Sequence, residues 1–498
     1  MTQTLTDLLE RGSADRSAIL VPGGPVLTYA RLRQLVAEGA ERLAAFGVGP
    51  LDRVAMALPN GPEAIVLFLS AALGATACPL NPAYKEDEFR FYLEDTGARV
   101  LLVPPGEGEA ARRALPQGGI VIEAEIDSRG ELRLASAEFG GTGRPVQPSG
   151  PDDVALVLHT SGTTSRPKRV PLRHRNLVAS VGNITAHYQL TEEDVSLCAM
   201  PLFHVHGLVA SALSALAAGG TVVTPRKFTP LNFWPLAREY RPTWFSASPT
   251  PQRMILMRTS EDRPGGTERL RFVRTCSSAL TPAQMAEMEA RYGVPVLEAY
   301  GMTEASHQMA SNPLPPGRRQ PGSVGPGTGV EIATMSDAGQ LLPPGTAGEV
   351  VIRGPNVIDG YESNAEANAA SFTEGWFRTG DLGMLDKDGY LTLSGRLKEL
   401  INRGGEKIAP LEVDSVLEAH PAVAEAVSFG LPHPTWGEQV AAAVVLSSPA
   451  DEQELLAYCR EHLAEFKVPT TIYLVEAIPR TATGKVQRRF VAEAFAPK

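Results

Sequence analysis

The stretch 158–168, with the sequence LHTSGTTSRPK, carries the residue types that suit the binding of an oxyanion. Consecutive backbone N–H groups can form a concave nest for an anion, and the closing lysine adds a compact, mobile positive charge. An apolar run at 154–158 predicts a buried strand, so the polar loop begins where α/β sheets usually place their ligands. The predicted oxyanion contacts are Thr160, Ser161, Gly162, Thr163, Thr164 and Lys168.

This loop is not a phosphate loop of the Walker type, because that motif needs Gly-Lys-Ser/Thr with a helix directly after it. Here Arg169, Val170 and Pro171 follow the lysine, and the residue before a proline is biased away from the helical region. The chain is therefore expected to continue as a strand, with the loop at the tip of a hairpin. Taken alone, the composition is also that of a solvated Ser/Thr-rich surface loop.

A second group of chemically capable residues, Tyr-Gly-Met-Thr-Glu at 300–304, follows a predicted strand at 294–297. Magnesium prefers few protein carboxylates and completes its shell with phosphate oxygens and water, so one glutamate beside a phosphate loop suits it. The alternative is a plain junction of strand, turn and helix, in which the glycine makes the turn and Thr-Glu starts the helix.

The overall composition is that of a large globular protein. Its 498 residues are too many for one core, so we expect two or more domains, and 43% hydrophobic with 20% charged residues is an ordinary balance. The net charge of −10 argues against a nucleic-acid partner, which would favour a basic surface. The four cysteines form no Cys-x-x-Cys pair, which favours a reducing compartment, and we expect a cytoplasmic protein.

Neither a signal peptide nor a membrane-spanning helix is expected. Asp7, Glu10 and Arg11 interrupt the N-terminal segment too early for a secretory signal. The longest apolar stretch without charge, residues 64–84, contains glycine, asparagine and proline, which favours a buried helix followed by a strand over insertion into a membrane.

Hydrophobic periodicity predicts the elements that position these groups. Helices are expected at 29–46 and 63–73 and strands at 53–58 and 99–103, and this alternation implies a parallel sheet with crossover helices. Residues 325–394 carry an all-β signal. The roughly one hundred residues after them have helix and strand patterns of their own, which is enough for a small α+β domain.

Five segments together resemble the motifs of the adenylate-forming superfamily, which includes acyl-CoA synthetases, luciferases and the adenylation domains of peptide synthetases. The resemblance covers nearly the whole chain, with Arg169 where the family usually has glycine. It implies an α/β fold: a large N-terminal domain of parallel α/β sheets plus a β-barrel-like part, and a small mobile C-terminal α+β domain. The implied boundaries are 1–395 for the large domain, 396–399 for a hinge and 400–498 for the small domain. The five segments are 158–168, 300–304, 376–381, 403–410 and 479–488.

The resemblance also implies roles for individual residues in a reaction that uses ATP, Mg²⁺ and coenzyme A. Thr303 would contact the α-phosphate, Glu304 would hold Mg²⁺, and Lys485 would be the catalytic lysine of the small domain. Lys398 would be the pivot about which the small domain rotates between two half-reactions. The other implied contacts with the nucleotide are Ser278, Ala279, Tyr300 and Gly301, of which the Tyr300 ring would stack on adenine and 277–279 would line the adenine and acyl pockets. Asp381 and Arg396 would bind the ribose, and Gly404 and Gly405 would reach the pantetheine tunnel.

Within the superfamily, several stretches are most similar to plant and fungal oxalate–CoA ligases, among them PLFHVHG at 201–207 and MTEASH at 302–307. His206, Ser277 and His307 are polar candidates for the acyl site, where a pocket for a fatty chain would be apolar. A helical turn after Glu304 is expected to bring His307 to the same side. A buried second carboxylate needs hydrogen-bond donors or a positive partner, and histidine can supply either.

The sequence therefore predicts an AMP-forming ligase that joins a small carboxylic acid to coenzyme A, with oxalate as the first choice of acid. Malonate or another short or medium-chain acid is the second choice, and loading of a separate carrier protein is a third reading. The alternative from a different class is a nucleotide-binding regulatory protein without turnover. A homodimer is left open.

Overall fold

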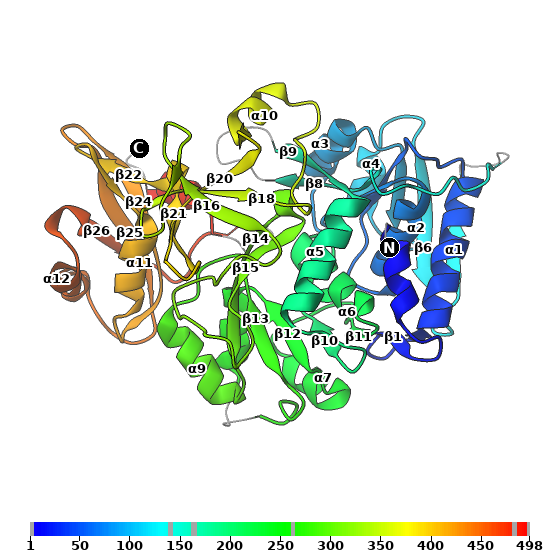
Figure 1. The fold of residues 1–498 in the computed structure, drawn as a ribbon, viewed down its shortest axis with the longest axis horizontal. Coiled ribbons are helices and arrows are strands. Elements are labelled where there is room, and N and C mark those ends of the chain that lie inside the picture. The colour runs from blue at the N-terminus through cyan, green and yellow to red at the C-terminus, as the bar shows by residue number, and fades with distance from the viewer. Residues whose placement is uncertain (1–3, 138–142, 161–166, 260–263, 481–485, 496–498) are drawn as a thin grey trace.

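Two helix-covered sheets, an antiparallel sheet and a small C-terminal unit make up the protein, which we describe from a computed structural model (Figure 1). The structure describes residues 4–137, 143–160, 167–259, 264–480 and 486–495. In Figure 1 the N-terminal strands and helices occupy one side, and the C-terminal strands with α12 (Glu452–His462) lie at the opposite end. This architecture confirms the predicted fold class.

The first sheet has seven strands in the order β7-β6-β5-β3-β4-β8-β9. Its inner strands run parallel, and β7 and β9 pair antiparallel at the two edges. Two predicted helices appear as α1 (Tyr29–Ala45) and α2 (Pro62–Gly74), and α2 is buried along nearly its whole length. Helix α4 (Glu109–Ala114) was not predicted. The other bounds are β3 (Arg53–Met56), β4 (Thr76–Pro79), β5 (Val100–Val103), β6 (Ile120–Ile126), β7 (Leu132–Ala135), β8 (Val154–Thr160), β9 (Lys168–Arg173) and α3 (Glu86–Thr96).

The second sheet has eight strands in the order β15-β14-β13-β12-β10-β11-β1-β2. One apolar core, which joins side chains of both sheets, fills the space between them. The strands are β1 (Ser17–Leu20), β2 (Val26–Thr28), β10 (Val195–Cys198), β11 (Thr221–Val223), β12 (Trp244–Ala247), β13 (Phe272–Thr275), β14 (Val296–Met302) and β15 (His307–Ser311). The helices of this part are η1 (Thr6–Arg11), α5 (His174–His187), η2 (His206–Leu213), α6 (Ser214–Ala217), α7 (Phe233–Tyr240), α8 (Pro249–Leu256) and α9 (Pro282–Tyr292).

The strand predicted at 294–297 is longer than expected. Strand β14 continues through Tyr300 and Gly301 to Met302, so most of the 300–304 motif lies in a strand rather than in a turn. The reason is long-range pairing: β15 returns antiparallel and pairs with β14 from Ala299 to Met302. The backbones approach so closely that a Cβ on Gly301 would lie 2.1 Å from the carbonyl oxygen of His307.

Residues after 325 form the predicted all-β part, an antiparallel sheet that one short helix, α10 (Ala365–Ser371), interrupts. The turn at 386–389 joins β20 to β21 as a hairpin. The strands are β16 (Glu331–Met335), β17 (Leu341–Leu342), β18 (Gly348–Arg353), β19 (Phe372–Thr373), β20 (Trp376–Leu385) and β21 (Leu391–Arg396).

The C-terminal unit has its own sheet and two apolar clusters whose buried members all follow residue 400. A 3-10 turn, η4 (Leu397–Glu399), leads into it. The boundaries at 395 and 400 stay predictions. Among the described residues no helix is long and apolar enough to cross a bilayer. The remaining elements are β22 (Ile401–Arg403), β23 (Glu406–Ile408), α11 (Pro410–Glu418), β24 (Val423–His433), β25 (Gly437–Leu446), η5 (Glu465–Lys467), β26 (Thr471–Leu474) and α13 (Arg488–Phe495).

Candidate active site

The predicted phosphate loop joins the two strands of a hairpin. Thr160 ends β8 and pairs with Lys168, which begins β9, so the chain does continue as a strand after the lysine. The Thr160 hydroxyl is buried and has no hydrogen-bond partner among the described residues. An orphaned hydroxyl at the base of the loop fits a site for an oxyanion. Ser161, Gly162, Thr163 and Thr164 lie outside the described residues.

Arg169, which replaces the usual glycine, supports the hairpin from the side. Its Nε lies 3.3 Å from Glu362 Oε2 and 3.7 Å from Asp95 Oδ2. His159 Nε2 lies 3.0 Å from Asp95 Oδ2, and Arg53 pairs with Glu362. These contacts tie both strands of the hairpin to α3 and to the segment after β18, so the arginine fixes the base of the loop.

Glu304 lies on a 3-10 turn, η3 (Thr303–Ala305), directly after β14. Its carboxylate is buried and accepts a hydrogen bond from the Tyr361 hydroxyl at 2.8 Å. Lys168 Nζ lies 3.9 Å from the centre of the Tyr361 ring. Burial lowers the pKa of Lys168; the charge of Glu304 opposes this shift, and the charge of Lys398 adds to it. Thr303, Glu304 and Lys168 therefore lie around one point.

The residues present fit a magnesium ion that is held mainly by its nucleotide. In the described part of the chain, no three His, Cys, Asp or Glu side chains group as a metal cage. Glu304 is a buried carboxylate beside the phosphate hairpin. Magnesium usually takes one or two protein carboxylates and fills the other positions with phosphate oxygens and water. Glu304 is the residue that would hold it.

Three residues predicted at the nucleoside come together from three strands. The Tyr300 hydroxyl on β14 hydrogen-bonds to Asp381 on β20. Arg396 on β21 pairs in register with Asp381, and its Nε lies 3.0 Å from Asp381 Oδ1. Burial raises the pKa of Asp381, and the adjacent Arg396 opposes this shift. The three side chains therefore form one hydrogen-bonded and ion-paired cluster.

Ser277, Ser278 and Ala279 form an exposed turn after β13. Ser277 has a φ of +83°, a left-handed conformation that is uncommon for serine. The turn does not cap α9, because Thr281 does so: its hydroxyl accepts from the Gln284 N–H at 3.2 Å. These three residues are therefore available to line a pocket.

The three candidates for the acyl site lie together. His206 opens η2, an eight-residue π-helix, and its Nδ1 lies 3.1 Å from Ser277 Oγ. The rings of His206 and His307 are 5.1 Å apart between centres, and both side chains are buried. A Cβ on Gly207 would lie 2.2 Å from the Pro201 carbonyl oxygen, so the chain needs glycine directly after His206.

The predicted helical turn that carries His307 is wrong. The 3-10 turn ends at Ala305, and Ser306 and His307 then have φ values of +54° and +111°. These two left-handed residues reverse the chain so that His307 becomes the first residue of β15. His307 does lie beside His206, but antiparallel pairing with β14 places it there rather than a helical spacing from Glu304.

One residue at this site was missed: Arg274, at the centre of β13, which is fully buried. It donates to Ser246 Oγ at 2.9 Å, to Gln308 Oε1 at 3.0 Å and to Tyr188 Oη at 3.0 Å. It also lies 3.3 Å from His206 Nε2 and 3.3 Å from His307 Nδ1. The signal was present in the sequence as a lone arginine in the strand Phe-Val-Arg-Thr. Arginine is almost never fully buried unless it is paired, so an arginine in a buried strand calls for a partner.

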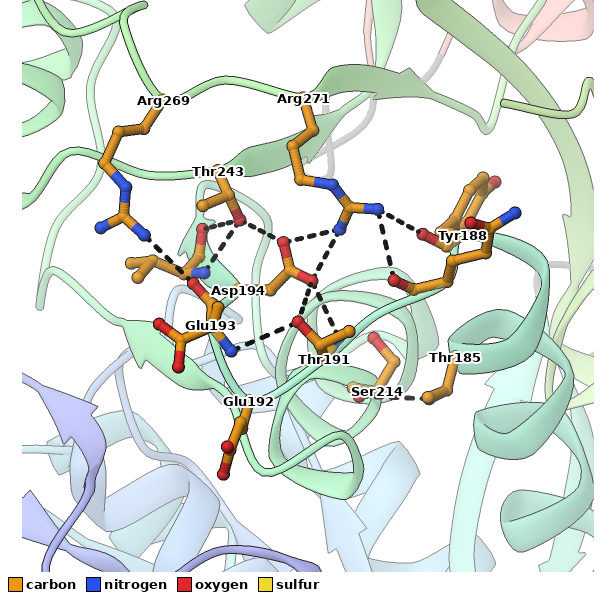
Figure 2. A network of polar contacts seen from close by, with 12 residues as sticks. Thr185, Tyr188, Thr191, Glu192, Glu193, Asp194, Ser214, Thr243, Arg269 and Arg271 are labelled. Carbon is orange, nitrogen blue, oxygen red and sulfur yellow. Dashed lines mark hydrogen bonds and ion pairs between the residues drawn. The ribbon is translucent and has the colours of Figure 1, made fainter. Parts of the chain in front are cut away.

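A separate polar network fixes the start of β13 (Figure 2). Arg271 donates to both carboxylate oxygens of the buried Asp194, at 2.7 and 2.6 Å. Asp194 also accepts from the Thr243 hydroxyl at 2.6 Å, and Arg271 reaches the Tyr188 carbonyl at 3.1 Å. Figure 2 shows Asp194 between Thr243 and Arg271. This network holds the end of α5 against the sheet that carries the candidate acyl site.

The contacts of the C-terminal unit with the rest of the molecule include two arginines, Arg488 and Arg480. Arg488 pairs with Asp414 at 2.6 Å and with Glu399 at 3.2 Å, next to Lys398 on η4. Arg480 donates to Thr250 Oγ1 at 3.1 Å, across to the large domain. Gly404 and Gly405, with φ of +62° and +98°, make the turn between β22 and β23. Lys485 lies outside the described residues.

Comparison with known proteins agrees with this arrangement. Residues 9–362 match the AMP-binding enzyme family, and residues 412–485 match the C-terminal domain of AMP-binding enzymes. The chain belongs to this family. A probable CoA ligase, CCL9, of Humulus lupulus is 48% identical over 99% of this chain and 96% of its own length. An oxalate–CoA ligase of Arabidopsis thaliana is 45% identical over 100% of this chain and 99% of its own.

Solved AMP-binding enzymes share the whole architecture. The crystal structure of ATP-bound MatB from Rhodopseudomonas palustris superposes with a TM-score of 0.89, at 32% identity, over 99% of both chains. Membership of the family makes this chain an AMP-forming ligase of a carboxylic acid and coenzyme A, which uses ATP and Mg²⁺. The roles given to individual residues stay predictions.

Proposed function

We propose that this chain is an oxalate–CoA ligase. The observation that carries the proposal is the polar cluster of His206, Ser277 and His307, in which His206 Nδ1 lies 3.1 Å from Ser277 Oγ and the two histidine rings lie 5.1 Å apart between centres. An alkyl chain would need apolar side chains at this point, whereas a second carboxylate needs donors. The similarity to an oxalate–CoA ligase over the full length of both chains supports the same acid.

The proposed reaction has two steps. In the first, a carboxylate oxygen of oxalate attacks the α-phosphorus of ATP, and the bond to pyrophosphate breaks. In the second, the thiol of coenzyme A loses its proton and attacks the acyl carbonyl, which releases AMP. Thr160, Lys168, Thr303 and Lys485 are the proposed donors to the phosphates, and Glu304 is the proposed ligand of Mg²⁺. Positioning and stabilisation of oxyanions supply most of the catalysis in such a site.

The proposed second step needs a different placement of the C-terminal unit. Lys398 lies on a three-residue turn between the two parts, and such short segments absorb the torsion changes of a domain rotation. After rotation the turn with Gly404 and Gly405 would face the acyl-adenylate, where the absence of side chains lets coenzyme A approach the backbone. Lys485 would leave the site in the same movement.

A panel of acids tests the proposal. We expect CoA-dependent AMP formation to be fastest with oxalate, and kcat/KM for acetate to be lower by a factor of about 10⁴, because acetate leaves buried donors unpaired. Hexanoate should be excluded by its volume. Efficient turnover of hexanoate, or a clear preference for malonate over oxalate, would overturn the oxalate assignment while the ligase activity itself would remain.

A further inference from the structure

We propose that Arg274 is the positioning residue of the acyl site: it fixes the tautomers of both histidines and supplies the positive charge behind them that selects an anionic acyl tail. This inference rests on the proposed function, since it concerns how the second carboxylate of the acid is recognised. Arg274 does not itself need to touch the acid, because His206 lies between its guanidinium and the exposed turn at Ser277, and His307 contacts the same guanidinium.

The first ground is an unbalanced charge. Arg274 is fully buried, and among the described residues no ion pair includes it. Its acceptors include the neutral side chains of Ser246, Gln308 and Tyr188 together with the two histidines. They satisfy its N–H groups but leave its charge uncompensated. A buried charge without an opposite partner is strongly unfavourable, so this site is completed when an anion enters.

The second ground is the orientation of His206. Arginine has only donors, so His206 Nε2, which faces Arg274 at 3.3 Å, must be the acceptor nitrogen. Ser246 Oγ lies 2.6 Å from the same nitrogen and accepts from Arg274, so its own hydroxyl hydrogen points to His206. The proton of His206 is then on Nδ1, which donates to Ser277 Oγ. The Ser277 hydroxyl hydrogen is left to donate outward, to a carboxylate.

The same reasoning applies to His307. Its Nδ1 faces Arg274 at 3.3 Å and must accept, so its proton is on Nε2, at the far side of the ring. A single guanidinium thus sets two rings that come from η2 and β15 so that each turns a donor away from the arginine. The Ser277 hydroxyl and His307 Nε2 are then the donors on this side, and donors backed by a positive charge suit a carboxylate and do not suit a neutral amide of the same shape.

Oxalate and oxamate are the matched pair that tests this inference. Oxamate keeps the reacting carboxylate and the planar shape but carries a neutral amide in place of the second carboxylate. For the wild-type chain we expect kcat/KM for oxalate to exceed that for oxamate by a factor of about 10³, because the amide N–H groups meet donors and the charge stays unpaired. The assay is CoA-dependent AMP formation with ATP saturating.

In the Arg274→Met variant we expect kcat/KM for oxalate to fall by a factor of about 100, mainly through KM, while oxamate changes less than about fivefold. Arg274→Lys should recover part of the preference, since it keeps the charge but lacks the fork that reaches both rings. The control is Arg271→Met, the same replacement in the charge-balanced network, for which the preference between the two acids should stay as in the wild type.

Two results would overturn the inference. One is a wild-type chain that uses oxamate as well as oxalate, a measurement that does not depend on whether any variant folds. The other is an Arg274→Met variant that binds ATP normally but loses oxalate and oxamate activity by equal factors, as a merely structural role would produce. If the wild type prefers malonate, the oxalate proposal fails, and malonate against malonamate in the same variants decides the role of Arg274 by itself.

Discussion

Two arginines at one strand of the second sheet serve opposite purposes. Arg271 directly precedes β13 and Arg274 lies within it, and both contact Tyr188, the first through its carbonyl oxygen and the second through its hydroxyl. Arg271 faces the buried carboxylate of Asp194 with two hydrogen bonds. Arg274 is the more deeply buried of the two and, in the described structure, forms no ion pair. A balanced charge is part of the scaffold, and an unbalanced one marks a ligand site.

The comparison gives opposite expectations for stability at the two positions. Removal of one partner from a buried pair leaves an uncompensated charge, whereas removal of an already uncompensated charge relieves its desolvation. Both side chains can be replaced by methionine, which is similar in length and carries no charge. The two variants thus form a matched pair within four residues of sequence.

The largest expected effect on stability is that of Arg271→Met. This change strands the Asp194 carboxylate, whose side chain is 2% exposed, and should lower the free energy of unfolding by about 3 kcal/mol. Arg274→Met should change it by no more than about 1 kcal/mol, because lost hydrogen bonds and relieved desolvation offset each other. Urea denaturation followed by circular dichroism measures both. Equal losses at the two positions would mean that Arg274 is as structural as Arg271.

The next effect concerns His307. We expect His307→Ala to lower kcat/KM for oxalate by a factor of about 100, equivalent to about 2.7 kcal/mol, and to leave ATP binding without acid unchanged. If Arg274 acts through the histidines, the double variant His307→Ala/Arg274→Met should be much less impaired than the product of the two single effects. Steady-state kinetics on the four proteins gives the coupling. Strictly multiplicative losses would show that arginine and histidine act independently.

The smallest effect should come from Tyr188→Phe, which separates the two arginines. It removes the hydroxyl that accepts from Arg274 and leaves the carbonyl that accepts from Arg271. We expect a loss of about 1 kcal/mol in the free energy of unfolding and a severalfold rise in KM for oxalate, with KM for ATP unchanged. If the variant loses stability without any change in KM for oxalate, the Tyr188 hydroxyl has only a structural role, like the contacts of Arg271.

Local patterns predicted much of the fold and the order of the site segments. The hairpin of β8 and β9 followed from an apolar run, a polar loop and a proline two residues after Arg169. The alternating strands and helices before residue 104 appear close to their predicted bounds. These features depend on hydrophobic periodicity and on backbone preferences of short segments, which a sequence carries directly.

The missed features depend on contacts between distant segments. Strand β14 continues to Met302 because β15 pairs with it, and the local sequence Tyr-Gly-Met does not predict a pairing strand. Likewise the contacts of Arg274 come from four separate segments: the C-cap of α5, η2, β12 and β15. The sequence could therefore reveal a charged residue in an apolar run but not the side chains that surround it. Ser306 and His307 adopt left-handed φ values that neither residue type favours, and only the completed sheet imposes them.

The π-helix that starts at His206 has a consequence for how this family could change its choice of acid. Such a segment holds more residues per turn than an α-helix, and it is equivalent to an α-helix with an inserted residue. Loss of one residue between Leu208 and Leu213 would restore the ordinary period, and because the wider turn already takes up the extra residue, His206 would keep its side of the helix. A deletion in the α-helical turn that follows, α6, has no extra residue to absorb it and would turn every earlier residue of the helix by about 100°. The π-helical segment therefore protects the position of the histidine from changes in length, and a change in the choice of acid there requires a substitution at the site itself.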